Sequence, residues 1–175
     1  MPDAGATQIN ATTFPGLVGQ IQNESQVIGS QMGAFPSDVN VRFVPTLLGN
    51  TNPGALAESR PEGRTWVVGI DASAMAGSKV ALAMRIAHEL EHGLKFFNEF
   101  NGDRAAWIAA AGASRAMLNY SNLATKMYSA GRGSSIEQGL LRTAITAQDR
   151  YFNRNPFETP SYQRSAAVYS EYFGQ

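Results

Sequence analysis

Residues 80–97 carry the most regular apolar pattern in the chain, with apolar side chains recurring at intervals of three and four residues. The positions that make this pattern are Val80, Ala83, Ile86, Ala87, Leu90, Leu94 and Phe97. This spacing predicts an amphipathic α-helix that begins after a cap at Asp71 or Ser73 and ends near Gly102. It is the best-defined element of the sequence, so the fold must accommodate a long amphipathic helix.

Two segments before this helix have the character of β-strands, namely residues 39–44, which end at Pro45, and Thr65–Ile70. Residues 47–63 are rich in Gly and Pro, which predicts a long loop. Further helices are expected over residues 14–32, 103–130, 134–152 and 161–173, the third of them with a capping box at Ser134–Glu137. The predicted class is α+β, a small mixed β-sheet with an edge strand followed by a mainly helical bundle. We expect residues 1–175 to form a single domain in which residues 1–13 are loose.

Length and composition exclude several classes of function. A chain of 175 residues is long enough for one sizeable core, so it needs neither disulfides nor a structural metal merely to fold. Its formal charge is zero, which argues against nucleic acid as a partner. Because cysteine is absent, disulfide frameworks, thiol catalysis and Cys-rich zinc sites are excluded.

The N-terminal residues show no basic segment followed by an apolar one, so a cleaved secretory signal is not expected. The most apolar stretch, residues 105–114, is half of the ~20 residues that a membrane span needs. We therefore expect a soluble chain without a membrane span. Its localisation stays open, including secretion by a route other than the general secretory one.

The predicted helix contains the sequence His88-Glu89-Leu90-Glu91-His92. Four residues make about one helical turn, so both imidazole rings lie on one face, ~6 Å apart. At this spacing both rings can reach one zinc ion at ~2.0–2.1 Å. Glu89 lies about 100° around the helix from His88, where its carboxylate can exchange a proton with a metal-activated water. We assign Glu91 to the solvated outer face.

Chance rarely produces this motif. At ~2% His and ~6% Glu, a random chain of this length contains it with a probability on the order of 0.004. His88 and His92 are also the only two histidines in the sequence. The plain alternative is a pair of surface histidines on a solvated helix. We predict instead a site for Zn²⁺, with His88 and His92 as ligands and Glu89 as general base.

The motif resembles that of the zincin metallopeptidases, in which it supplies two zinc ligands and the general base. Small and apolar neighbours, Ile86-Ala87 and Gly93-Leu94, suit a helix packed deep in the domain. In zincins an edge strand lies beside the metal and pairs with an extended protein or peptide substrate, which implies that role for Thr65–Ile70. The resemblance covers the chain from about residue 65 onward.

A catalytic zinc site has three protein ligands and one open position, so an acid must join the two histidines. Metzincins use a residue six positions after the second histidine, which here is Asn98, so that pattern fails. Glu99 is about 10 Å along the helix axis from His92, too far to share the ion. Asp103 has a spacing comparable to the aspzincin ligand but lacks its Gly-Thr-rich signature. The other acidic candidates are Glu137, Asp149, Glu158 and Glu171.

Residues 155–162, Asn-Pro-Phe-Glu-Thr-Pro-Ser-Tyr, resemble an Asn-Pro-x-Glu-x-x-Ala-Tyr segment of small bacterial gluzincins (minigluzincin-like peptidases). In those enzymes the glutamate, on a later helix, is the third zinc ligand. The resemblance therefore implies that Glu158 is the third ligand here, ahead of Asp103. Ser161 in place of Ala is a mild departure from the pattern.

The local sequence leaves the position of Glu158 in its helix open. Asn155 as N-cap and Pro156 as first residue would put Glu158 in a first helical turn. Pro160 lacks a backbone donor, which favours a helix that begins near Thr159 instead. Alternatively, Glu158 only completes a capping box with Asn155.

A peptidase of this kind needs a hydrogen-bond donor for the oxyanion that forms on the attacked carbonyl, and no histidine is left for this role. Tyr162 is the candidate, because it follows Glu158 by four residues and would lie on the same helix face. The alternatives are Tyr169, Tyr151, Arg154 and Arg164. The aromatic residues of the C-terminal region, like Phe96, Phe97 and Phe100, are more typical of a core than of a substrate pocket.

The leading interpretation is a single-domain zinc endopeptidase of the gluzincin type. The lack of a signal peptide and of cysteine suits a bacterial effector or toxin delivered by a dedicated secretion machine, and an inhibitor or immunity protein is then a further partner. Two alternatives stay open: a non-catalytic zinc-stabilised module that binds a protein, and a zinc amidase that acts on cell-wall peptides. The intact Glu89 argues against the first, because a purely structural site does not need that carboxylate.

Overall fold

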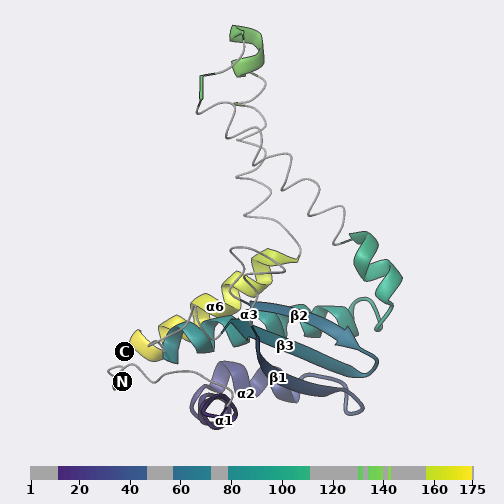
Figure 1. The fold of residues 1–175 in the computed structure, drawn as a ribbon, viewed down its shortest axis with the longest axis vertical. Helices are drawn as coiled ribbons and strands as arrows, with labels where there is room; N and C mark the ends of the chain where they lie inside the picture. The colour runs from purple at the N-terminus through teal and green to yellow at the C-terminus, as the bar shows by residue number, and fades with distance from the viewer. Residues whose placement is uncertain are drawn as a thin grey trace. The chain divides into compact units, whose positions relative to one another are not determined.

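The computed structural model describes residues 12–46, 57–71, 79–110, 130–131, 134–139, 142 and 157–174 (Figure 1). Its elements follow in the order α1 (Phe14–Glu24), α2 (Gln26–Gly33), β1 (Asn40–Thr46), β2 (Ala57–Glu62), β3 (Thr65–Asp71), α3 (Lys79–Asn98) and α6 (Glu158–Phe173). A small mixed sheet accompanied by helices confirms the predicted α+β class. Packing groups the chain into two compact units, residues 1–103 with 160–175 and residues 104–159. The single domain therefore stays a prediction, and residues 1–11 lie outside the described part.

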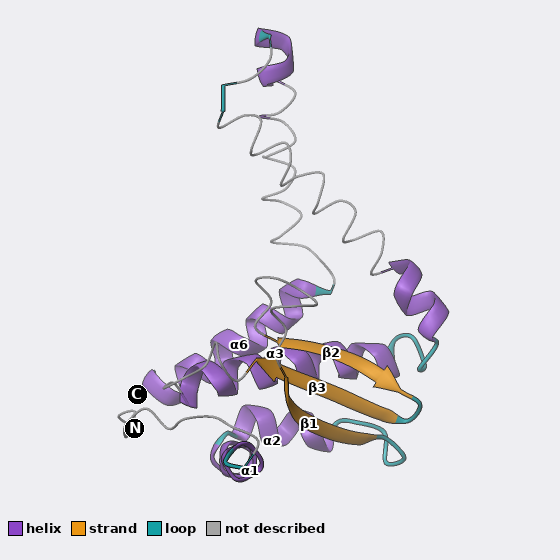
Figure 2. Cartoon of the chain, in the orientation of Figure 1, coloured by secondary structure: helices purple, strands orange, loops and turns teal. Residues whose placement is uncertain are grey.

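The three strands are ordered β1-β3-β2, so β3 is the central strand of the sheet (Figure 2). β1 runs parallel to β3 and pairs Phe43 with Val68, whereas β2 runs antiparallel and pairs Ser59 with Val68. The prediction that Thr65–Ile70 forms an edge strand is therefore wrong. Residues 66–71 are all buried, which is the pattern of a strand covered on both faces.

β2 was not foreseen, because it lies in the second half of the predicted loop over residues 47–63. Residues 47–56 of that loop are outside the described part of the chain. Gly63, with a φ of 61°, and Arg64 form a two-residue connection between β2 and β3. Pro61 in β2 and Pro45 in β1 are tolerated because each lies in a strand with one neighbour in the described sheet.

The predicted helix over residues 14–32 is two helices, α1 and α2, separated at Ser25. Ser25 has extended backbone, and its Oγ accepts a hydrogen bond from the Ile28 amide at 3.1 Å. The Ser25 hydroxyl also donates to Glu171 Oε2 at 2.7 Å, and the Gln26 amide donates to Glu171 Oε1 at 2.5 Å. A carboxylate from α6 thus stabilises the start of α2, because helix N-terminal amides favour negative charge.

α3 lies behind the strands and packs against α2, β2 and β3 (Figure 1). The Trp66 indole of β3 donates from Nε1 to the backbone oxygen of Glu89 at 2.8 Å and stacks on Phe96 with ring centroids 5.6 Å apart. A Cβ on Gly93 would lie 2.7 Å from this indole, closer than real Cβ atoms come. Gly93 therefore lets Trp66 lie flat on α3, and this contact sets the rotation of the helix that carries the motif.

We expect Gly93→Ala to destabilise the protein by about 1–3 kcal/mol, the usual cost of overfilling a packed core. Trp66 is 1% exposed, so an added methyl group would press on a packed side chain. Gly19→Ala in α1 is the control, because a Cβ there meets nothing within 4 Å. That change should stabilise the protein by up to ~1 kcal/mol through helix propensity. Urea denaturation of both variants measures the difference, and equal midpoints would contradict the Trp66 contact.

The second unit contains helical residues at 104–110 and 135–139. The predicted capping box is confirmed: the Ser134 amide donates to Glu137 Oε2 at 2.6 Å, and the Glu137 amide donates to Ser134 Oγ at 3.4 Å. The Ser134 amide and the Ser134 hydroxyl both donate to the Glu137 carboxylate, which lowers the pKa of Glu137. The remainder of the helices predicted over residues 103–130 and 134–152 lies mostly outside the described residues. Among the described helices, none has the length and apolar character to cross a membrane.

Candidate metal centre

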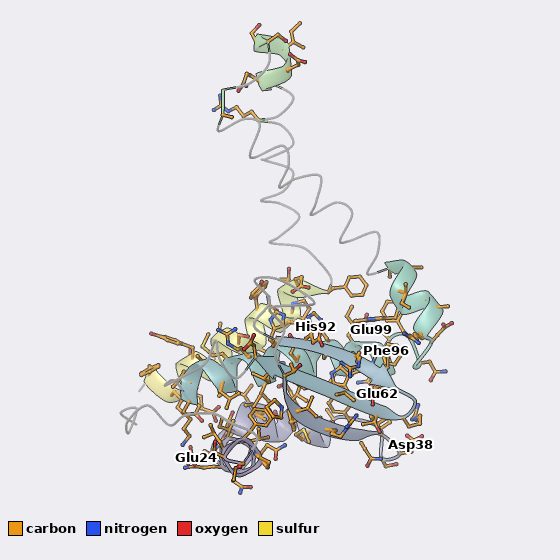
Figure 3. All side chains as sticks on the ribbon, viewed as in Figure 1. Glu24, Asp38, Glu62, His92, Phe96 and Glu99 are labelled. Atoms are coloured by element: carbon orange, nitrogen blue, oxygen red, sulfur yellow. The ribbon has the colours of Figure 1, made fainter. Side chains whose placement is uncertain are left out.

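His88 and His92 converge on the side of α3 that meets α6. Figure 3 labels His92. Their Nε2 atoms are 3.2 Å apart, and the two rings lie at 81° to each other. Two ligands held 2.0–2.1 Å from one ion at the tetrahedral angle are about 3.3–3.4 Å apart, so this separation suits a shared metal ion. The two rings do not point outward into solvent as independent surface side chains, since both residues are half-buried.

Glu158 is the first residue of α6 and joins the two histidines. One ligand atom from each of His88, His92 and Glu158 lies within 4.8 Å of the others. Pro160 is the third residue of the helix, where the backbone N–H has no intrahelical acceptor, so the proline is tolerated there. α6 thus begins three residues before the predicted start at residue 161. Two imidazoles and one carboxylate are a donor set found in catalytic zinc sites, and they can hold a metal ion.

Ser161 is a site residue that the sequence analysis underestimated. Its side chain is fully buried, and its Oγ lies 3.3 Å from His92 Nδ1, the ring nitrogen opposite the one that faces His88. A hydrogen bond from Nδ1 to a second residue fixes the tautomer and orientation of a metal-binding histidine. The only signal in the sequence was its spacing, three residues after Glu158 on one helix.

Replacing Ser161 by Ala should weaken zinc binding about tenfold, the lower end of the range for loss of such a supporting partner. Ser165→Ala is the matched control, because Ser165 is buried on the same helix but donates to the Met84 carbonyl oxygen. Competition with a fluorescent zinc chelator measures both affinities. Equal affinities in the two variants would show that Ser161 does not support His92.

Glu89 is 7% exposed and lines a pocket of about 440 Å³ together with His88, Ala57 of β2 and Tyr162 of α6. Its Oε2 accepts a hydrogen bond from the hydroxyl of Ser59 on β2 at 2.5 Å. Ser59 was hidden from the sequence analysis because it lies in the segment predicted as a loop. A carboxylate bound by Ser59, at the wall of an open pocket and beside two histidines, is placed for proton transfer.

Tyr162 lies on the pocket wall as its position after Glu158 suggested. Its ring centroid is 4.9 Å from that of His88, and the residue is 59% exposed. Among the alternative donors, Tyr169 packs on Phe173. Tyr151 and Arg154 are not among the described residues. Of the aromatic residues expected in the core, Phe96 and Phe97 are buried there.

The structure gives most of the other acidic candidates different contacts. Glu99 pairs with Lys95 on α3, Glu137 completes a capping box, and Glu171 binds the start of α2. Asp103 is not part of the cluster formed by the histidines and Glu158, and Asp149 lies outside the described residues.

The assignment of Glu91 to the solvated outer face is wrong. Its Oε2 accepts hydrogen bonds from Gln31 Nε2 of α2 at 3.1 Å and from Arg164 Nε of α6 at 3.0 Å. Arg164 is therefore also engaged in an ion pair. The periodicity of α3 could not reveal this, because α2 and α6 are the elements that cover this side of the helix.

Comparison of the chain with protein-family models, with curated proteins and with solved structures finds no significant match.

Proposed function

We propose that the protein is a zinc-dependent endopeptidase in which His88, His92 and Glu158 hold the metal and Glu89 is the general base. The observation that carries the proposal is the convergence of these three side chains within 4.8 Å of one another, next to a buried glutamate on a pocket wall. A structural zinc site is closed by four protein ligands, whereas three ligands beside a pocket suit a catalytic one.

Each residue of the site has a role that follows from its contacts. When bound, a zinc ion lowers the pKa of water and polarises a carbonyl oxygen. Glu89, held at Oε2 by Ser59, takes a proton from the attacking water and returns it to the leaving amine. Tyr162 is exposed and lines the same pocket, and its hydroxyl donates a hydrogen bond to the developing oxyanion.

The substrate strand is proposed to pair with β2 rather than with the central β3. β2 has a single neighbour within the described sheet, Ala57 at its start lines the pocket, and Ser59 contacts Glu89. An extended peptide can add to such an edge through main-chain hydrogen bonds. This arrangement would bring the peptide bond of a bound substrate alongside α3.

The experiment is to measure the metal content of the purified protein and the hydrolysis of unfolded casein, with and without a chelator. We expect about one zinc per chain, cleavage of casein, loss of cleavage on chelation and recovery on adding zinc. Bound zinc without hydrolysis of any peptide would instead indicate a zinc-stabilised binding module. Release of fragments from purified peptidoglycan, with casein untouched, would indicate a cell-wall amidase.

A further inference from the structure

Arg85 lies on the wall of the pocket that Glu89, His88 and Tyr162 also line. It precedes His88 by three residues on α3, so its side chain emerges near the motif. The guanidinium Nε is buried and has no hydrogen-bond partner among the described residues. Burial lowers the pKa of Arg85. An arginine nonetheless stays protonated in a protein, so the pocket holds a positive charge that lacks a partner in the described chain.

In contrast to Arg85, the other described arginines of the first unit form ion pairs with carboxylates. Arg42 pairs with Glu62, Arg64 with Asp38 and Lys79 with Glu24. Arg60 and Arg164 are also paired with carboxylates. A half-buried arginine without such a partner is costly, because desolvation of its charge is not offset by an anion.

The metal centre does not supply the missing anion. A divalent ion bound by His88, His92 and Glu158 is balanced by the carboxylates of Glu158 and Glu89. Glu89 is itself held by the Ser59 hydroxyl. With the site loaded, the guanidinium of Arg85 still has no anionic partner among the described residues of the pocket.

We propose that this pocket binds a carboxylate group of the substrate and that Arg85 is the residue that recognises it. The inference rests on the proposed peptidase function and adds a substrate class to it, namely peptides with a carboxylate near the cleaved bond. The carboxylate belongs either to an acidic side chain or to the C-terminus of a peptide. Arginine suits this role because its planar fork binds a carboxylate through two parallel hydrogen bonds.

The dimensions and surroundings of the pocket are compatible with this occupant. Its volume of about 440 Å³ falls in the range of small-ligand sites. Ala81 and Met84 also line the pocket, and a charged hydrogen bond is stronger beside their apolar surface than in bulk water. Tyr162 on the opposite helix can orient the same group.

The test uses zinc-loaded Glu89→Gln protein, so that binding is measured without turnover. Three sets of fluorescein-labelled hexapeptides of Gly and Leu are compared by fluorescence anisotropy. Peptides of the first set contain one Glu and have an amidated C-terminus. Those of the second set contain one Gln and have an amidated C-terminus, and those of the third contain one Gln and have a free C-terminus. We expect one of the two carboxylate sets to bind about tenfold more tightly than the neutral set, a factor that corresponds to ~1.4 kcal/mol. The set that binds more tightly shows whether the carboxylate comes from an acidic side chain or from the C-terminus of the peptide.

Adding Arg85→Gln should remove this gain, whereas Arg42→Gln, which deletes a paired surface charge, should preserve it. Equal binding of all three sets, or no binding of any, would overturn the proposal. In protein with Glu89 intact, a loss of turnover in Arg85→Gln that is the same for neutral and acidic peptides would also overturn it, since Arg85 would then act on the oxyanion. Casein hydrolysis by the wild type decides the peptidase function separately, so the two failures are distinguishable.

Discussion

Glu89→Gln is expected to retain zinc and to lose proteolysis by a factor of about 10²–10⁴, the usual contribution of a general acid–base residue. Gln has nearly the shape of Glu but cannot take up a proton from water. Glu89 is buried at the pocket wall, where Ser59 can still hydrogen-bond to an amide oxygen. The variant should therefore fold and bind metal normally. Initial rates of casein hydrolysis at equal zinc occupancy measure the effect.

The control for this variant is Glu99→Gln, which makes the same chemical change just beyond the C-terminal end of the same helix. Glu99 is exposed and pairs with Lys95, away from the pocket. Its loss should leave the rate within about twofold, because exposed ion pairs contribute little to stability. If Glu89→Gln and Glu99→Gln cleave casein equally well, Glu89 is not the base. If Glu89→Gln loses its zinc as well, the carboxylate acts as a ligand.

Glu158→Ala should weaken zinc binding by more than about a hundredfold, beyond the range for loss of a supporting partner. The change removes one of three ligands and leaves two histidines, which can hold the ion only loosely. Asp103→Ala is the comparison, since both positions were candidates in the sequence but only Glu158 lies with the histidines. We expect Asp103→Ala to bind zinc as the wild type does.

Thermal stability separates loss of the ligand from loss of the fold. Zinc that binds only the folded state raises the melting temperature by mass action. The wild type and Asp103→Ala should both gain stability on addition of zinc, whereas Glu158→Ala should gain little. The metal-free melting temperatures of Glu158→Ala and the wild type should be similar, because Glu158 is half-buried and lies in a first helical turn. Unchanged zinc affinity in Glu158→Ala would remove it from the site.

The elements with strong local patterns were predictable. The apolar spacing over residues 80–97 corresponds to α3, and Thr65–Ile70 to β3, because periodicity reflects which faces are buried. Ser134 and Glu137 form their capping box for the same local reason. The C-terminal helix was also expected, although its start at Glu158 was not, since a proline in a first turn leaves the boundary open.

The errors concern contacts between distant segments. Residues 14–32 have one continuous apolar stripe, yet the helix ends at Ser25, where the carboxylate of Glu171 meets the chain. β2 consists of Ala57–Glu62, whose two glutamates, one arginine and one proline give little strand signal. It forms because β3 offers a free edge and a two-residue turn returns the chain to it. The order of the strands followed from that pairing.

The sequence by itself determined that His88, Glu89 and His92 share one region of a buried helix, because the α-helical repeat alone sets which side chains lie together. The tertiary structure decided which acid and which hydroxyls complete the site. Ser161 lies 69 positions from His92 along the chain, and Ser59 lies 30 from Glu89. Such contacts depend on how α3, α6 and β2 pack, and no local spacing encodes that packing.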